Sequence, residues 1–158
     1  MAVREINIGV LPTACWIEYA HRRELEAATL ADPDMYRAER LASRIVTFQN
    51  DVAGFNKDAR RGWPNAVLSV MADDDVSLPA AFSAVAERHD LDVSELEETC
   101  DRLARRRGEA ARTWARGLKW MVAGLARWQS SAPRYTATLP GGEAVRVQLD
   151  AFGSHAHS

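Results

Sequence analysis

One polar stretch, Phe48–Asp58, carries the residues of this chain that are best suited to chemistry. If the stretch is helical, Asn50, Gly54 and Asp58 lie one turn apart along one edge, within roughly 80° of one another. An amide oxygen and a carboxylate are hard oxygen ligands of the kind that Mg2+ accepts when phosphate oxygens and water complete its shell. Lys57 would suit the same phosphate as a point charge. Polar faces with Asn and Asp are common, so the spacing alone leaves open a solvated helix face.

The helix that must position this stretch is predicted from its apolar residues, which recur in steps of three and four. They are Leu41, Ile45, Phe48, Val52 and Phe55. Asp32 is the expected N-cap and Pro33 lies in the first turn, where proline is tolerated. Gly62 and Pro64 end the pattern.

The rest of the chain up to residue 131 also has helical periodicity, so the predicted fold class is all-α. A helix is expected over Pro12–Ala31 with Thr13 as its cap, after a break near Gly9. Another is expected after Ser77. Ser94 and Glu97 fit a capping box that opens a long final helix, divided at Gly108 or Gly117.

That final helix carries a stripe of apolar residues, which is more typical of a core than of a ligand site. It consists of Trp114, Leu118, Met121, Val122, Leu125 and Trp128. After Tyr135 the helical pattern stops, and we expect an irregular tail in which 136–148 forms at most a weak hairpin.

Composition narrows the class of protein. The 158 residues are 47% hydrophobic and 27% charged, which is typical of an ordinary globular domain. A net charge of −2 gives no field that favours nucleic acid. No run is long enough for a membrane span and no secretory signal is evident, so a cytoplasmic location is expected. Cys15 and Cys100 are expected to be reduced core thiols, and Arg105–Arg107 a solvated helix face.

The polar stretch resembles the second metal-binding motif of class I terpene synthases, Asn-Asp-x-x-Ser/Thr-x-x-Lys-Glu. Asn50, Gly54 and Asp58 stand at its three ligand positions. Gly54 replaces the hydroxyl ligand, and Asp58 is one methylene shorter than the usual glutamate. Arg4 precedes the motif and the pair Arg134-Tyr135 follows it, at the intervals at which microbial members carry a pyrophosphate-sensing arginine and a terminal Arg-Tyr pair.

The resemblance implies the C-terminal helices of the class I terpenoid synthase fold. In a complete site of that family, three Mg2+ ions and basic residues bind a prenyl diphosphate and drive its ionisation. An apolar, aromatic-lined cavity then protects the allylic cation by cation–π contact and by excluding water.

The same resemblance assigns roles to individual residues. One Mg2+ would be held by Asn50, the Gly54 position and Asp58. The diphosphate would be engaged by Arg4, Lys57, Arg134 and Tyr135. Catalysis would involve Arg4 and Ile8, the latter in the short turn where the family's helix break aims a carbonyl at the substrate. Trp128 would be a cavity aromatic, and core packing is the equal alternative for it.

The aspartate-rich first motif of the family is missing from this sequence. The resemblance covers residue 4 to about residue 136, which corresponds to the second half of a synthase domain. We therefore expect a division into 1–136, the C-terminal part of such a domain, and 137–158, an irregular or flexible tail.

Two functions of different classes follow. In the first, the chain is the C-terminal portion of a terpene cyclase acting on farnesyl diphosphate, inactive alone and completed by a missing N-terminal half. In the second, it is a catalytically silent helical remnant that acts as a binding or interaction module and could form a homodimer through its uncovered face.

Overall fold

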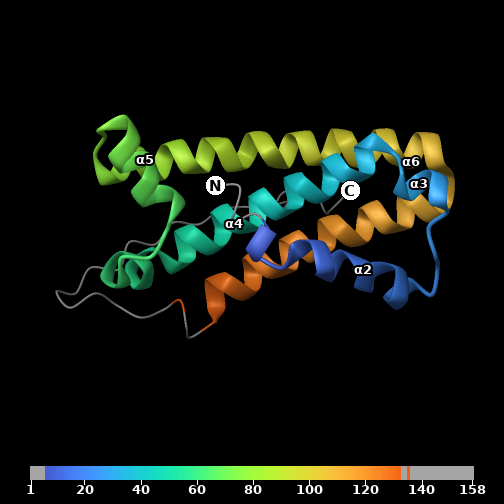
Figure 1. The fold of residues 1–158 in the computed structure, drawn as a ribbon, viewed down its shortest axis with the longest axis horizontal. Helices are drawn as coiled ribbons and strands as arrows, with labels where there is room; N and C mark the ends of the chain where they lie inside the picture. Colours follow the sequence, from blue (N-terminus) through green and yellow to red (C-terminus); the bar gives the residue numbers. More distant parts are fainter. Residues whose placement is uncertain (1–5, 133–134, 136–158) are drawn as a thin grey trace, which may run out of the picture.

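The structure, a computed structural model that describes residues 6–132 and residue 135, is helical with no strand in that part of the chain (Figure 1). Its helices are α2 (Val10–His21), α3 (Ala27–Leu30), α4 (Pro33–Arg61), α5 (Ala66–Asp74) and α6 (Leu78–Ser131). The predicted all-α class is confirmed, and the tail from residue 137 lies outside the described residues. None of the described helices is long and apolar enough to cross a membrane.

Helix α4 begins and ends as its sequence predicts. Asp32 is the N-cap, and its Oδ1 accepts a hydrogen bond of 2.9 Å from the backbone N–H of Asp34. Pro33 follows in the first turn, where its missing N–H costs nothing. Gly62 ends the helix in the left-handed conformation, with φ of 61°. These signals give one uninterrupted helix of 29 residues that carries the whole polar stretch.

Helix α6 doubles back on itself at Gly108. This residue has φ of 78° and ψ of −154°, a combination that essentially only glycine adopts. The two resulting segments, residues 78–107 and 109–131, are called here the first and second arms. In Figure 1 they meet at the turn and diverge from it, with the α4 ribbon drawn between them. Division at Gly108 was one of the two predicted positions. The predicted capping box at Ser94 is wrong, because Ser94 lies inside the first arm and its Oγ donates to the carbonyl of Asp90 at 3.0 Å.

The segment before α4 differs from its prediction as well. Helix α2 begins at Val10 with Gly9 as its N-cap, not at Thr13, whose Oγ1 donates to the Gly9 carbonyl at 2.6 Å. The helix stops at Arg22, which takes a left-handed conformation, and α3 forms separately. The helix predicted over 12–31 therefore contains a break that no glycine or proline marks.

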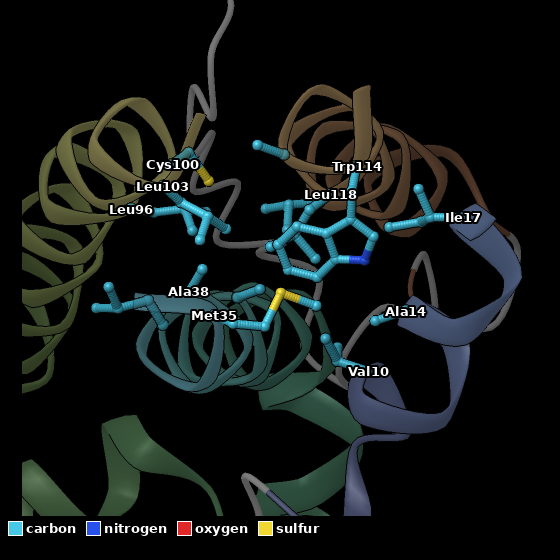
Figure 2. Close-up of a cluster of buried hydrophobic side chains, with 14 of the residues drawn as sticks. Val10, Ala14, Ile17, Met35, Ala38, Leu96, Cys100, Leu103, Trp114 and Leu118 are labelled. Carbon is cyan, nitrogen blue, oxygen red and sulfur yellow. The ribbon is translucent and has the colours of Figure 1, made fainter. Parts of the chain in front are cut away.

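A first core cluster lies where α4, the two arms of α6 and α2 meet. Figure 2 shows Met35 and Ala38 of α4 pointing towards Trp114 and Leu118 of the second arm. From the first arm come Leu96, Cys100 and Leu103, and from α2 come Val10, Ala14 and Ile17. Removal of these side chains from water is the main favourable term that holds the helices together.

Close approach of α2 to the second arm depends on Gly117, which stays helical. A Cβ atom placed on Gly117 would lie 2.5 Å from Cγ2 of Ile17, a distance that real Cβ atoms do not tolerate. The second candidate for a helix break in the sequence therefore serves a different purpose, which is contact between two helices.

A second core cluster lies beneath the polar stretch. Phe48, Val52 and Phe55 of α4 are buried against α5 and the start of α6. The rings of Phe55 and Phe82 meet edge to face with centroids 5.1 Å apart. The predicted apolar stripe of α4 is thus confirmed along its length, since all its members are buried.

The two cysteines differ in environment. Cys100 is buried in the first core cluster, and its burial raises the pKa of the thiol to about 12. Cys15 is exposed, so its predicted place in the core is wrong. It lies on the outer side of α2, whose buried residues are Val10, Ala14 and Ile17.

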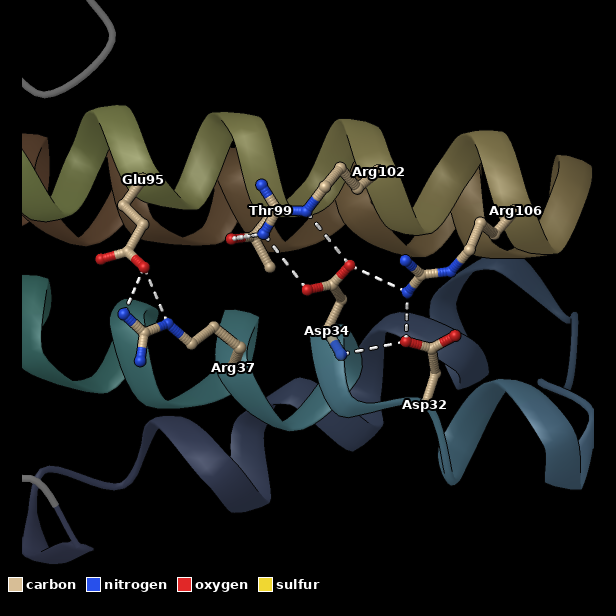
Figure 3. Close-up of polar contacts among 7 residues, drawn as sticks. All are labelled: Asp32, Asp34, Arg37, Glu95, Thr99, Arg102 and Arg106. Atoms are coloured by element: carbon tan, nitrogen blue, oxygen red, sulfur yellow. Dashed lines mark hydrogen bonds and ion pairs between the residues drawn. The ribbon is translucent and has the colours of Figure 1, made fainter.

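An ion-pair clasp joins the start of α4 to the end of the first arm. Arg102 and Arg106 both contact the Asp34 carboxylate, and Arg106 also contacts Asp32 (Figure 3). Arg107 Nε donates to Asp32 Oδ2 at 2.7 Å. The prediction that the basic run is only a solvated face is therefore wrong for Arg106 and Arg107.

The clasp keeps the Asp32 carboxylate ionised although its residue is only 2% exposed. Burial by itself raises the pKa of Asp32, but hydrogen bonds from the Asp34 N–H and from Arg107 and Arg106 outweigh it and lower the pKa to about 2. The hydrogen bond from Arg102 is the main cause that lowers the pKa of Asp34. Because the folded state depresses the pKa of Asp32, this carboxylate stabilises the fold above pH of about 4, and the stabilisation is lost as pH falls towards 2.

We expect Asp32→Asn to flatten the acid limb of the stability profile. The amide oxygen keeps the N-cap but removes the charge that Arg106 and Arg107 hold. Between about pH 6 and pH 2, the free energy of unfolding should fall by about 1–2 kcal/mol less in the variant than in wild type. Urea unfolding at several pH values measures this. Asp74→Asn, which alters a surface ion pair with Arg88, is the control and should follow wild type; identical profiles for Asp32→Asn and wild type would contradict the role of the clasp.

Candidate functional site

The second half of α4 presents the predicted ligand residues along one edge. The helical rise separates Asn50 and Asp58 by about 12 Å along the axis, with Gly54 midway. Side chains on a helix lean towards its N-terminus, and Asp58 leans back over Gly54. A Cβ atom at position 54 would lie only 3.2 Å from Oδ2 of Asp58, so the carboxylate occupies space that a larger residue would need.

Asn50 is tied to the residue after α6 that the resemblance singles out. Its Nδ2 donates a hydrogen bond of 2.8 Å to the hydroxyl oxygen of Tyr135. This bond uses the amide nitrogen, so it orients the side chain without occupying the Oδ1 oxygen that would serve as a metal ligand. Tyr135 also meets the Trp128 ring edge to face, with centroids 5.7 Å apart.

Lys57 lies where a carboxylate and two aromatic rings converge. Its Nζ is 3.2 Å from Oδ1 of Asp58. The same nitrogen lies 5.6 Å from the centroid of Trp63 and 5.7 Å from that of Tyr135, within cation–π range. Arg61 adds a second cation over Trp63 at 4.6 Å. Positive charge and aromatic surface are therefore concentrated beside the Asp58 carboxylate.

Asn65 and Asp51 join the polar stretch to the start of α5. Nδ2 of Asn65 donates to the carbonyl of Asp51 at 2.7 Å and to Oδ2 of Asp58 at 3.1 Å. Oδ2 of Asp51 accepts from the backbone N–H of Ala66 at 2.8 Å. Asp58 is only 2% exposed. Both oxygens of its carboxylate have partners, Asn65 through a hydrogen bond and Lys57 through an ion pair.

The structure brings six of the predicted site residues together: Asn50, Gly54, Lys57, Asp58, Trp128 and Tyr135. Ile8 lies instead in the turn before α2 and packs against the first core cluster. Arg4 and Arg134 are outside the described residues. Trp128 is 48% exposed, so it does not belong to the core, unlike Trp114 and Leu118 of the same predicted stripe.

Three residues of this region were missed by reasoning from sequence. Asp51 adjoins Asn50 but was read only as part of a motif, and its role as an anchor for α5 needs the fold. Trp63 lies between Gly62 and Pro64, the two residues that were predicted to end the helix, and nothing in that pattern gives it a role. Asn65, directly before an apolar run, has the position of an N-cap, and that signal could have identified it.

The donor set fits a divalent cation that also has non-protein ligands. Asn50 Oδ1 and the Asp58 carboxylate are hard oxygen donors on one edge of a helix, and an ionised carboxylate has lone pairs beyond those used by Asn65 and Lys57. Among the described residues, no group of three or more His, Cys, Asp or Glu side chains could hold a metal ion. A cation bound here would therefore need water or phosphate oxygens to complete its shell.

Comparison with known proteins identifies the family of this chain. The family described as terpene synthase family 2, C-terminal metal binding, matches residues 1–95, which include the whole polar stretch. Pentalenene synthase from Streptomyces exfoliatus is 25% identical over 179 residues, covering 99% of this chain and 50% of that protein.

The fold is shared with a solved structure. Linalool/nerolidol synthase from Streptomyces clavuligerus superposes with a TM-score of 0.73 at 20% identity, covering 80% of this chain and 46% of that one. The chain thus spans about half the length of the relatives it matches. Since the family match covers more than half of its residues, the chain belongs to terpene synthase family 2 and represents the C-terminal metal-binding region of a class I terpene synthase.

Proposed function

We propose that this chain supplies one metal-binding side of a prenyl diphosphate cyclase. The observation that carries the proposal is the convergence of Asn50, Asp58 and Lys57 on one edge of α4, with Tyr135 hydrogen-bonded to Asn50. Oxygen donors for a cation and a lysine for the phosphate then lie side by side, as metal-assisted loss of a diphosphate requires. The substrate we propose is farnesyl diphosphate.

In this proposal the metal is Mg2+, one of three in a complete site. Asn50 and Asp58 hold it, and a water takes the place of the hydroxyl ligand that Gly54 lacks. Bound Mg2+ would neutralise negative charge on the departing diphosphate. Lys57 donates to the diphosphate, and we assign the same task to Arg4, Arg134 and Tyr135 on the basis of their sequence positions.

Aromatic residues beside the site suit the cation that ionisation leaves behind. Trp128 and Tyr135 lie edge to face next to Asn50, and both rings can stabilise positive charge through their π faces. The partial exposure of Trp128 supports a place at the edge of a cavity. We assign residues 1–136 to the synthase domain and the cytoplasm as its location.

A second function is favoured by one observation. Trp16 and Tyr19 form an edge-to-face pair on the outer side of α2, and they are 65% and 77% exposed. Large contiguous patches of exposed apolar surface mark protein interaction sites, and in this second proposal the pair would form part of one. A catalytically silent interaction module would use such a surface, through a separate N-terminal half or a second copy of the chain.

The isolated chain is predicted to be inactive with farnesyl diphosphate and Mg2+, because the aspartate-rich ligands of the other ions are missing from it. Gas chromatography of extracts from the purified chain should show no terpene. Adding or fusing an N-terminal half from a relative with the aspartate-rich motif should produce one. A product from the pure chain would contradict the first expectation, and an inactive but folded fusion would favour the silent module.

Within the active fusion, Asn50→Ala should lower kcat by about 100-fold or more, because a ligand for the ion that stabilises the leaving group is lost. Asn56→Ala is a matched control on the same helix, since the buried Oδ1 of Asn56 has no hydrogen-bond partner among the described residues. That control should keep near wild-type turnover. Equal rates for Asn50→Ala and Asn56→Ala would remove Asn50 from the site.

Gly54→Ala tests whether the Asp58 carboxylate occupies the space above position 54. Alanine favours a helix by up to about 1 kcal/mol, but its Cβ would crowd Oδ2 of Asp58. We expect Gly54→Ala to stabilise the chain by about 0.5–1 kcal/mol more in an Asp58→Ala background than in wild type. Urea unfolding of the four proteins in this cycle measures the difference, and strictly additive effects would refute the contact.

A further inference from the structure

We propose that Asn65 is a positioning residue that holds the Asp58 carboxylate in place for the cation. The inference rests on the proposed function, because it gives Asn65 a task only if Asp58 is a ligand. It adds to that function a residue outside the three ligand positions.

The hydrogen bonds of Asn65 define which way its amide points. Nδ2 donates to the Asp51 carbonyl and to Asp58 Oδ2, while Oδ1 accepts from the backbone N–H of Val67 at 3.0 Å. Two acceptors face the nitrogen and one donor faces the oxygen, so the opposite orientation would lose all three bonds. The residue is 2% exposed, and water cannot easily replace these partners.

Asn65 is itself held by the fold. As N-cap of α5 it begins a helix whose Val67 and Val70 are buried in the second core cluster. Asp51 binds the next backbone N–H, that of Ala66, from α4. Contacts with both α4 and α5 therefore hold Asn65, and its side-chain Nδ2 is kept in one orientation towards Asp58.

The consequence falls on Asp58. Its Oδ2 is fixed by Asn65 and its Oδ1 by Lys57, at 3.1 and 3.2 Å. In this orientation the carboxylate lies over Gly54, towards Asn50, which is the direction that a shared cation requires. A shortened acidic side chain thus gains a defined position from a neighbour, and metal sites lose affinity when such supporting hydrogen bonds are removed.

Asn65→Ser separates this role from helix capping. Serine is also a strong N-cap and can accept from the Val67 N–H, but it is too short to reach Asp58. It adds no carboxylate that could bind the metal directly. Asn65→Thr is a second variant with the same logic. Val70→Ala is the stability control, because it removes a buried methyl pair from the same helix without touching the Asn65–Asp58 bond.

The experiment is a titration of the full 158-residue chain with Mn2+ in the presence of inorganic pyrophosphate, followed by electron paramagnetic resonance. We expect Asn65→Ser and Asn65→Thr to raise the Kd for Mn2+ by about 10–100-fold. Val70→Ala should bind within about twofold of wild type, although urea unfolding shows that it is destabilised. Affinity within about twofold of wild type in Asn65→Ser, or an equal loss in Val70→Ala, would overturn the inference.

Two further measurements keep the outcomes distinct. If wild type does not bind Mn2+, or if Asn50→Ala and Asp58→Ala bind as wild type does, the proposed function fails and the inference fails with it. A Mg2+ and pyrophosphate titration of 15N-labelled wild type needs no variant of Asn65. The side-chain amide resonances of Asn65 should shift when Asp58 binds the cation. If the Asn50 resonances shift and the Asn65 resonances do not, the proposed link between Asn65 and Asp58 is refuted.

Discussion

Everything in this structure depends on α4 being buried on one side and polar on another. Its apolar stripe packs into both core clusters, while its polar edge carries Asn50, Gly54 and Asp58. A helix with these two faces can hold oxygen ligands at fixed heights only if packing prevents it from rotating or sliding. The clasp of Asp32 and Asp34 with arginines of the first arm helps to fix its N-terminal end. The start of α5 is joined to the second half of α4 by hydrogen bonds from Asn65 and from the Ala66 N–H to Asp51.

The candidate site combines two departures from the motif that it resembles, Gly54 and Asp58. Glycine at position 54 leaves space that a side chain would fill. The Asp58 carboxylate lies so close to this space that a Cβ atom at position 54 would crowd it. The short Asp58 side chain is held by Asn65 and Lys57. The two departures therefore act on the same small volume, and their effects should be interpreted together.

Charge in the chain serves two separate purposes. Near the turn of α6, arginines neutralise buried carboxylates and join helices, and the depressed pKa of Asp32 reflects that use. Near the end of α4, Lys57 and Arg61 lie over the Trp63 ring, and Lys57 also contacts the Asp58 carboxylate. These cations lie beside the residues of the candidate site and, within the described part of the chain, do not join helices. Net charge alone, close to zero, could not distinguish these two regions.

Local patterns in the sequence were enough to predict the helical class, the two ends of α4 and the register of Asn50, Gly54 and Asp58, because caps and a 3.6-residue period are local properties. They left the division of the last helix open between Gly108 and Gly117, and the fold placed it at Gly108. The resemblance to class I terpene synthases pointed to Tyr135, and only the tertiary structure showed that its hydroxyl accepts a hydrogen bond from Asn50. The exposure of Cys15, the arginine clasp and the hydrogen bond from Asn65 to Asp58 were decided by tertiary structure. The first depends on which face of α2 is covered, the clasp joins residues 68 to 75 positions apart in the sequence, and the Asn65 bond crosses the turn between α4 and α5. Periodicity along one helix contains no information on any of these.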